Sequence, residues 1–124
     1  MCGIAGLLSS NIDLRGERLL IQNISKTLEN RGPDSAGSYI TPSVALIHRR
    51  LAVIDVENGA QPMHFGKYVI VYNGELYNTD EVRQELESYG YKFDTHCDTE
   101  VVLKAYDKWL VSYMAEAKKI KPDT

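Results

Sequence analysis

The sequence predicts one mixed α+β domain whose sheet is mostly antiparallel. A length of 124 residues is typical of a single domain with its own apolar core. The composition, 44% hydrophobic and 25% charged, is that of an ordinary globular protein. The expected elements run in the order β-α-β-β-β-β-α-β-α, in which strands follow one another instead of alternating with helices, and this order favours the α+β class.

A strand and an amphipathic helix are expected first. Residues 3–9 are small and apolar, which is typical of a buried strand. From Glu17 to Asn30 the apolar positions recur at helical spacing, until Arg31-Gly32-Pro33-Asp34 breaks the pattern. The positions expected on the inner face of this helix are Leu20, Ile24, Thr27 and Leu28.

Four strands are expected next. The segments 37–41, 44–48, 51–55 and 68–72 are rich in β-branched or aromatic residues. Turn residues separate them, notably Pro42 and the loop 57–62. Such short, closely spaced strands indicate antiparallel pairing.

Two helices with a short strand between them complete the predicted fold. Asn78, with Glu81 three residues later, resembles a capping box, and Gly90 is a typical stop for that helix. A strand is expected over 91–95, and a second helix is expected from Asp98 or Thr99. The residues expected on its inner face, before a lysine-rich tail, are Val102, Ala105, Tyr106, Trp109 and Tyr113.

Composition argues against several functional classes. Seventeen acidic and fourteen basic side chains give a formal charge of −3, so we expect no nucleic acid partner. The longest apolar run, Tyr68 to Tyr72, is far shorter than the roughly 18 residues of a membrane span, and no membrane association is expected. The N-terminus has no signal-peptide pattern, and two cysteines are too few for a disulfide framework. We therefore predict a cytoplasmic protein.

Cys2 directly follows the initiator methionine. Removal of Met1 would place a free α-amine and a thiol on the same residue, so that one residue supplies both base and nucleophile. Cys2 could equally be a small hydrophobic residue at the start of a buried strand. Its position alone leaves both interpretations open.

Three further polar groups follow predicted strands or open a predicted helix. Asn73-Gly74-Glu75 could supply an amide and a backbone N–H for an oxyanion hole, although Asn-Gly is also a common hairpin turn. Arg50 could bind a carboxylate through its forked guanidinium, or it could belong to a solvated strand edge. Asp98 could bind a cation, or it could simply cap the last helix.

Metal and nucleotide sites are not predicted. The three histidines, His48, His64 and His96, and the two cysteines lack the close pairing that is typical of zinc ligands. No glycine-rich loop ends in Gly-Lys-Ser/Thr, the pattern that binds phosphates.

Six blocks, in the same order over residues 1–109, resemble the glutaminase domain of glutamine-hydrolysing asparagine synthetases, which belongs to the class II glutamine amidotransferases. The blocks are Met1-Cys2-Gly3-Ile4-Ala5-Gly6, Arg31-Gly32-Pro33-Asp34, His48-Arg49-Arg50-Leu51, Gln61-Pro62-Met63, Tyr72-Asn73-Gly74-Glu75-Leu76-Tyr77-Asn78 and Asp98-Thr99-Glu100-Val101-Val102-Leu103. The resemblance implies an N-terminal-nucleophile sandwich, two antiparallel sheets between layers of helices. It also selects the nucleophile interpretation of Cys2.

The resemblance implies a role for each candidate residue in glutamine hydrolysis. Cys2 would attack the side-chain amide, and Asn73 and Gly74 would form the oxyanion hole. The substrate would be held by Arg50 at its α-carboxylate, by backbone groups of Leu51, Val53 and Ile54, and by Glu75 and Asp98 at its α-ammonium. Ammonia would leave, and water would hydrolyse the resulting glutamyl thioester.

The resemblance ends after Trp109, so we expect a glutaminase domain over 1–109 and an unmatched helical extension with a charged tail over 110–124. The second part of the sandwich is not recognised. The glutaminase reaction implies no cofactor, whereas ATP and magnesium would belong to a synthetase domain that this sequence does not contain. The expected partners are L-glutamine, a synthetase domain or partner subunit, and a second copy of the chain if an apolar sheet face stays open.

Two functional hypotheses remain. The chain is either a cysteine-dependent glutaminase that supplies ammonia for asparagine synthesis, or an inactive glutamine-binding or interaction module. Residues 31–37 also resemble part of glucosamine-6-phosphate synthase, so the glutaminase part of another amidotransferase is an alternative. Release of glutamate by the purified chain separates enzyme from module.

Overall fold

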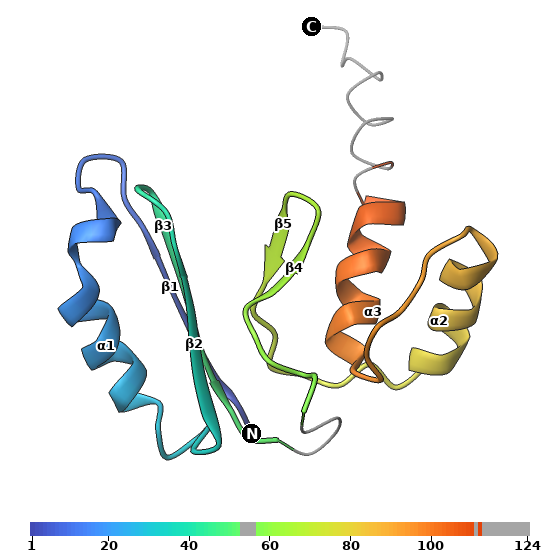
Figure 1. Cartoon of the computed structure of the whole chain (residues 1–124), viewed down its shortest axis with the longest axis horizontal. Coiled ribbons are helices and arrows are strands. Elements are labelled where there is room, and N and C mark those ends of the chain that lie inside the picture. Colours follow the sequence, from blue (N-terminus) through green and yellow to red (C-terminus); the bar gives the residue numbers. More distant parts are fainter. Residues whose placement is uncertain (53–56, 111, 113–124) are drawn as a thin grey trace, which may run out of the picture.

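The computed structural model describes residues 1–52, 57–110 and 112. In this part the fold is α+β, with two small antiparallel sheets and several helices (Figure 1). The elements are β1 (Gly3–Leu8), α1 (Arg18–Thr27), β2 (Ser35–Ile40), β3 (Val44–Arg50), β4 (Met63–Phe65), β5 (Tyr68–Ile70), α2 (Thr79–Ser88) and α3 (Asp98–Ala105). A short 3-10 turn over Leu14–Gly16 precedes α1, and a π-helical turn over Tyr106–Leu110 continues α3.

The N-terminal half is a three-stranded sheet covered by one helix. Its strand order is β1-β3-β2, with β3 paired antiparallel to both neighbours. Helix α1 lies against one face of this sheet (Figure 1). Between them lies an apolar core made of Leu14, Ile21, Ala45 and Ile47.

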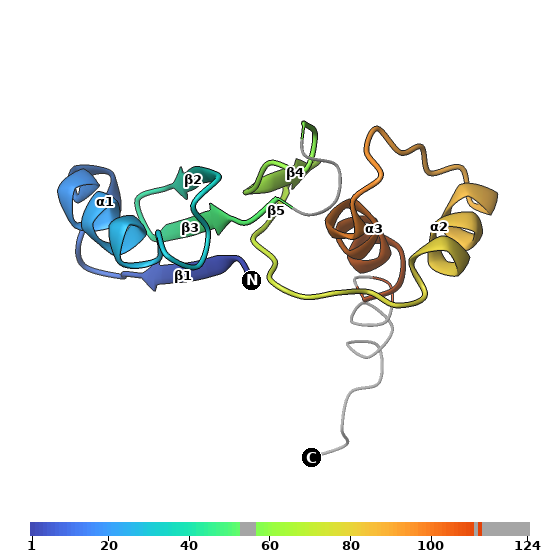
Figure 2. The same ribbon diagram turned by 90° about the horizontal axis from the view of Figure 1, so that it is seen from below.

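The C-terminal half is less regular. Strands β4 and β5 form a two-stranded hairpin, and α3 lies between this hairpin and α2 (Figures 1 and 2). Its buried apolar residues include Leu86, Val101 and Leu103. Glu100 and Lys104 are buried beside them as an ion pair, with the Lys104 Nζ 2.7 Å from the Glu100 carboxylate.

The two predicted strands over 51–55 and 91–95 are wrong wherever the structure describes those residues. The Leu51 amide donates to the Cys2 Sγ at 3.4 Å, and the Ala52 amide donates to the Asp34 carboxylate at 2.7 Å. Likewise, the amides of residues 94 and 95 donate to the carboxylate of Glu100. Side chains therefore satisfy these backbone groups instead of a neighbouring strand. Residues 53–56 lie outside the described residues.

Strand β4 and parts of the helix faces differ from the prediction. Residues 63–65, which carried no predicted strand, pair with β5. In α1 Ile21 is buried and Ile24 packs against the core as predicted, whereas the predicted inner residues Leu20 and Thr27 are exposed. The helix face toward the sheet follows positions 21, 24 and 28, and residues 20 and 27 lie beside it. In the last helix, Tyr106 is exposed, and a predicted inner position, Tyr113, lies outside the described residues.

The helix ends agree with the prediction more closely than the faces do. Helix α3 begins at Asp98, and α2 is followed by Gly90, which has a positive φ of 97°. The Asn78 side chain makes no capping hydrogen bond, so the predicted capping box is wrong. None of the helices in the described ranges is long and apolar enough to cross a membrane.

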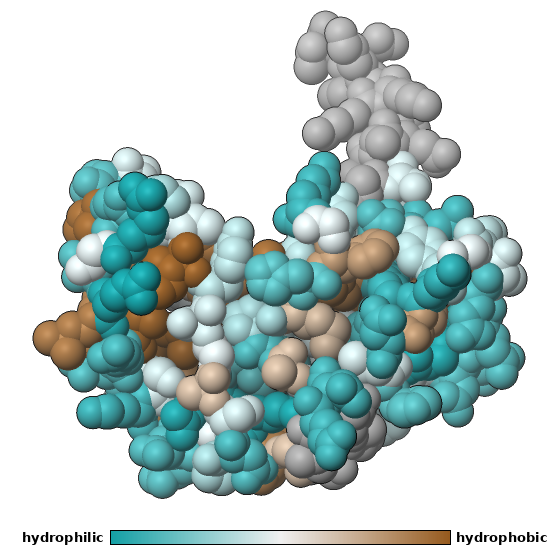
Figure 3. Space-filling view, viewed as in Figure 1, coloured by the Kyte–Doolittle hydropathy of each residue, from teal (hydrophilic) through white to brown (hydrophobic). Residues whose placement is uncertain are grey.

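The face of the three-stranded sheet that points away from α1 is partly uncovered. Ile4 and Leu8 of β1 lie on this face and are exposed, Leu8 to 85%. In Figure 3 hydrophobic surface gathers over the half that contains β1 to β3, while the half with α2 and α3 is largely hydrophilic. Burial of this sheet is therefore one-sided within the described residues.

Candidate functional site

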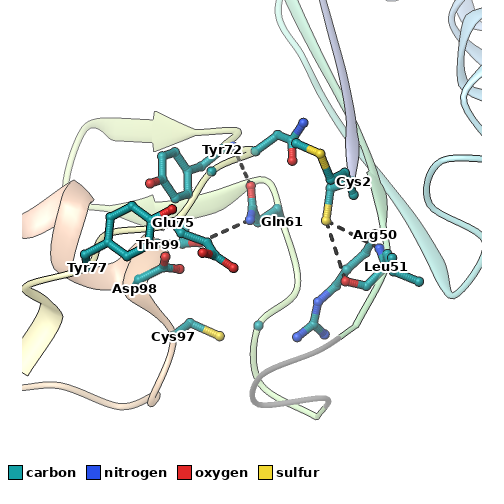
Figure 4. A pocket seen from close by; sticks show the side chains of 14 residues that line it. Cys2, Arg50, Leu51, Gln61, Tyr72, Glu75, Tyr77, Cys97, Asp98 and Thr99 are labelled. Carbon is teal, nitrogen blue, oxygen red and sulfur yellow. Dashed lines mark hydrogen bonds between the residues drawn. The ribbon is translucent and has the colours of Figure 1, made fainter.

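A cavity of about 480 Å³ lies where the two halves of the chain meet (Figure 4). It is lined by Met1, Cys2, Arg50, Leu51, Gly59, Gln61, Tyr72, Asn73, Gly74, Glu75, Tyr77, Cys97, Asp98 and Thr99. The structure therefore brings together all the predicted site residues that it describes. Val53 and Ile54, two predicted substrate-binding positions, lie outside the described residues.

Cys2 enters the cavity from the start of β1. Its Sγ accepts a hydrogen bond from the Leu51 amide at 3.4 Å and donates to the Leu51 carbonyl at 3.7 Å (Figure 4). The Arg31 Nε donates to the Cys2 carbonyl at 3.4 Å. The side chain is half-buried rather than packed in the core, so its sulfur is accessible from the cavity.

The turn over Arg31-Gly32-Pro33-Asp34 holds the end of β3 beside Cys2. The Asp34 amide donates to the Arg50 carbonyl at 2.9 Å, and the Asp34 carboxylate accepts from the Ala52 amide. The Arg49 Nε donates to the Gly32 carbonyl at 3.0 Å. These bonds fix the backbone on both sides of Leu51, the residue that contacts the cysteine sulfur.

Arg50 places a buried positive charge in the cavity. Arg50 is 7% exposed, and its guanidinium packs tightly against Gly59. A Cβ on residue 59 would lie 2.2 Å from the Arg50 Nη2 and 2.6 Å from the Cys97 Sγ, so a side chain there would displace the guanidinium or the thiol. The solvated-edge interpretation of Arg50 is therefore wrong.

Two carboxylates lie across the cavity from Arg50 (Figure 4). Asp98, the first residue of α3, accepts a hydrogen bond from the Leu76 amide at 3.0 Å. Glu75 immediately precedes Leu76 in the chain. Burial raises the pKa of Tyr72, and the negative charges of Asp98 and Glu75 raise it further. The cavity thus presents one cation and two anions, the complement of an amino acid's α-carboxylate and α-ammonium groups.

Asn73 and Gly74 line the cavity in the segment that leads from β5 to α2. The next element after β5 is a helix, so this pair does not connect two paired strands. The hairpin interpretation of Asn-Gly is therefore wrong. Their assignment to an oxyanion hole stays a prediction.

Sequence reasoning gave no role to several residues that line the cavity. Gln61 belonged to a recognised block, Gln61-Pro62-Met63, but nothing in that block indicated what its side chain contacts. The sequence offers Cys97 only as a possible metal ligand, and Thr99 only as part of a helix start. Their roles depend on contacts between distant segments, and these leave no local pattern in the sequence.

His48 is buried behind the cavity, not among the residues that line it. It is 1% exposed, and its Nε2 has no hydrogen-bond partner. Burial lowers the pKa of His48, and the positive charge of Arg50 lowers it further, while the backbone of Tyr72 acts in the opposite direction. Among the described residues, no group of three or more His, Cys, Asp or Glu side chains could hold a metal ion.

Comparison with known proteins adds the family. A family described as "Glutamine amidotransferase domain" matches residues 1–119. The chain belongs to this family. This glutamine amidotransferase domain is 42% identical, over 113 residues and 88% of its length, to asparagine synthetase [glutamine-hydrolyzing] 3 of Bacillus subtilis, of which it covers 18%.

Relatives in eukaryotes give the same result. The identity is 38% over 117 residues to asparagine synthetase [glutamine-hydrolyzing] 1 of Arabidopsis thaliana, with 92% of this chain and 20% of the relative covered. It is 41% over 108 residues to a probable asparagine synthetase [glutamine-hydrolyzing] of Schizosaccharomyces pombe, with 86% and 19% covered. The chain thus spans about a fifth of the length of these curated relatives.

Proposed function

We propose that this amidotransferase domain hydrolyses the side-chain amide of L-glutamine to glutamate and ammonia, with Cys2 as the nucleophile. The observation that carries the proposal is one cavity lined by a thiol, a buried arginine and two carboxylates, Glu75 and Asp98. The names of the relatives, which are glutamine-hydrolysing, support the choice of substrate.

The charges define one orientation of the substrate. Its α-carboxylate would pair with Arg50, and its α-ammonium would pair with Asp98 and Glu75. The side-chain amide would then extend toward Cys2 and the segment Asn73-Gly74. Backbone groups of Leu51, Val53 and Ile54 would complete the contacts with substrate.

The reaction would proceed in two steps. The Cys2 sulfur attacks the amide carbon, and the negative charge that develops on the amide oxygen is stabilised by the Asn73 side chain and the Gly74 amide. Collapse of this intermediate breaks the C–N bond, and the leaving nitrogen takes a proton and departs as ammonia. Water then attacks the γ-glutamyl thioester, which releases glutamate and regenerates the thiol. These steps need no cofactor.

The base that we propose is the α-amine of Cys2. With Met1 attached, the Cys2 nitrogen is a peptide amide without a basic lone pair. Met1 also lines the cavity, where its side chain would compete with substrate. Removal of Met1 would therefore both create the base and clear space beside the thiol.

We also infer the larger assembly in which this domain acts. The uncovered face with Ile4 and Leu8 is consistent with an N-terminal-nucleophile sandwich, in which a second sheet would pack on that face. Ammonia would pass to a synthetase domain or partner subunit that makes asparagine, and ATP and magnesium would act only there. We expect this chemistry in the cytoplasm.

The decisive experiment compares two forms of the 124-residue chain, one that begins at Met1 and one trimmed to a free Cys2. Intact mass establishes each form, and glutamate release from glutamine measures turnover. We expect the trimmed form to hydrolyse glutamine and the form with Met1 to be inactive. Equal turnover by both forms would show that the α-amine is not the base.

Titration calorimetry with glutamine separates the enzyme from a binding module. Binding and hydrolysis by the trimmed form support the proposal. Binding without hydrolysis would favour the inactive glutamine-binding module, and absence of both would reject glutamine as the ligand of this chain.

A further inference from the structure

We infer that the side chain of Gln61 is a positioning residue that sets the length of the substrate site and selects glutamine over the shorter amide asparagine. The inference rests on the proposed glutamine hydrolysis. It concerns the residue that holds the two ends of the cavity apart, not the groups that react or bind charge.

Gln61 connects two segments that approach the cavity from different directions. Its Oε1 accepts a hydrogen bond from the Tyr72 amide at 2.6 Å, and its Nε2 donates to the Thr99 Oγ1 at 3.1 Å (Figure 4). Both the donor and the acceptor group of the amide are thus used. A side chain with both groups satisfied in this way holds one conformation.

Each partner of Gln61 is adjacent in sequence to a proposed substrate-binding group. Tyr72 immediately precedes Asn73, at the end of the site where the amide reacts. Thr99 immediately follows Asp98, at the end where the α-ammonium binds, and is itself buried in the first turn of α3. The Gln61 side chain therefore bridges the two ends of the substrate site.

The backbone of Gln61 is fixed to the sheet half of the molecule. A Cβ on Gly37 of β2 would lie 2.0 Å from the Gln61 carbonyl oxygen, so the two backbones are in direct contact. Strand β2 pairs with β3, the strand that ends in Arg50. Gln61 thus links the segments of Asn73 and Asp98 to the sheet that carries Arg50 and, through β1, Cys2.

This bridge has a consequence for specificity. Glutamine and asparagine carry the same charged groups and the same amide, and differ by one methylene between them. A site can distinguish them only if its charged end and its reacting end stay at a fixed separation. Because a displacement of about 1 Å at a reacting centre can cost roughly a hundredfold in rate, the rigidity of the bridge controls this selection.

Three substitutions test the inference in the chain from which only Met1 has been removed. Gln61→Met keeps an unbranched side chain of similar length but removes both hydrogen bonds. Thr99→Val keeps the shape of threonine but removes the hydroxyl, and Thr99→Ser is its matched control because it retains the hydroxyl. The measurements are kcat and KM for glutamine and the inhibition constant of asparagine as a competitive inhibitor.

We expect the ratio of the asparagine inhibition constant to the glutamine KM to fall about tenfold in Thr99→Val. A fall of this size corresponds to the loss of discrimination between substrates that differ by one methylene. The ratio should fall further in Gln61→Met. Thr99→Ser should give the same ratio as the unmodified chain. Partial unfolding lowers the apparent kcat but leaves both terms of this ratio unchanged, so the ratio separates positioning from a merely structural role.

The outcomes distinguish this inference from the proposed function. An active unmodified chain with the same ratio in Thr99→Val as in Thr99→Ser would overturn the role of Gln61 alone. An unmodified chain that neither binds nor hydrolyses glutamine would overturn the proposed function, and with it this inference, before any substitution is made.

Discussion

The two halves of the molecule are built on different principles. In the N-terminal half, backbone ladders join β1, β2 and β3, and an apolar core lies between the sheet and α1. In the C-terminal half, side chains satisfy much of the backbone, as Glu100 does for the amides of residues 94 and 95. The N-terminal half carries Cys2, the proposed nucleophile, whereas the C-terminal half carries Asn73, Gly74, Glu75 and Asp98.

A buried ion pair contributes to the stability of the C-terminal half, whereas aliphatic packing stabilises the N-terminal half. The Glu100 and Lys104 side chains are only 6% and 7% exposed. The Lys104 Nζ also lies 4.7 Å from the ring centre of Phe93. Burial raises the pKa of Glu100, but hydrogen bonds from Lys104, Asp94 and Thr95 outweigh this effect and hold the pKa below its ordinary value. The carboxylate is therefore kept charged inside the protein.

The largest expected effect falls on Cys2, which the N-terminal half contributes to the cavity. Cys2→Ser should lower turnover by about a thousandfold or more, because removal of a nucleophile eliminates the covalent route. Glutamine binding should remain measurable, since the charged groups that we propose to hold the substrate are unchanged. Unchanged glutamate release by Cys2→Ser would reject Cys2 as the nucleophile.

A pair of substitutions tests the contrast in stability. Lys104→Met leaves the Glu100 carboxylate buried without its cation, which should cost about 3–5 kcal/mol. Ile47→Ala in the sheet core removes only packing and should cost about 2–5 kcal/mol. Urea unfolding at neutral pH measures both.

The double variant Glu100→Gln/Lys104→Met is the control for this pair. It removes both charges, so we expect it to recover most of the stability lost in Lys104→Met. If the double variant is as unstable as Lys104→Met, the C-terminal half depends on the lysine for packing rather than for charge.

The same contrast explains how much of the fold could be predicted. Strands 3–9 and 44–48 and the helix from Glu17 were recognised because local apolar periodicity reflects a sheet with one buried face. The segments 51–55 and 91–95 have the composition of strands, yet their amides bond to side chains of Cys2, Asp34 and Glu100. A local sequence pattern does not show which side chain will accept these hydrogen bonds, because the acceptor reaches the amide only when the chain folds.

The residues of the candidate site also differ in how far the sequence predicts them. The resemblance predicted the groups that would contact substrate, and the structure brings Cys2, Arg50 and Asp98 to one cavity. The resemblance gave no role to Gln61 or Gly59, whose contacts join segments that are distant in sequence. Residue types with reactive or charged groups can be recognised in the sequence. The residues that fix the distances between those groups can be identified only from the structure.

Asp98→Asn tests whether the C-terminal half binds the charged end of the substrate. The variant removes the anion that we propose to pair with the α-ammonium but keeps an oxygen that can accept from the Leu76 amide. A charged hydrogen bond contributes about 1.5–3 kcal/mol, so we expect the glutamine Kd to rise at least about tenfold. Titration calorimetry measures it.

Asp80→Asn is the matched control. Asp80 lies in the first turn of α2, is exposed, and is not among the residues that line the cavity. It should leave the glutamine Kd unchanged. Equal affinity in Asp98→Asn and in the unmodified chain would reduce Asp98 to a helix cap.

A smaller effect concerns pH and the boundary between the halves. Because the pKa of buried His48 lies below its ordinary value of 6.5, the unfolded state binds more protons than the folded state as the pH falls below that value. Stability should therefore decline on acidification from about pH 6.5, with a slope of at most about 1.4 kcal/mol per pH unit for one proton. His48→Gln should remove this component, whereas His64→Gln, at an exposed position, should retain it.

The smallest expected effect tests one more polar link within the C-terminal half. The Tyr91 hydroxyl donates to the Asp107 carboxylate at 2.5 Å and so joins the segment before α3 to the turn after it. This hydrogen bond, with burial, raises the pKa of Tyr91 to about 12. Tyr91→Phe should cost about 1 kcal/mol at neutral pH, in the range of a single hydrogen bond.

The dependence of stability on pH above 10 distinguishes this hydrogen bond from the packing of the Tyr91 ring. Between its ordinary pKa of 10.0 and about 12, Tyr91 loses its proton in the unfolded state but keeps it in the folded state, so stability should fall as pH rises through this window. Tyr91→Phe should lack that decline, and Tyr89→Phe, which keeps an exposed ring beside Trp109, should retain it. An identical alkaline decline in Tyr91→Phe would mean that another group titrates there, and that side-chain links contribute less to the C-terminal half than its packing does.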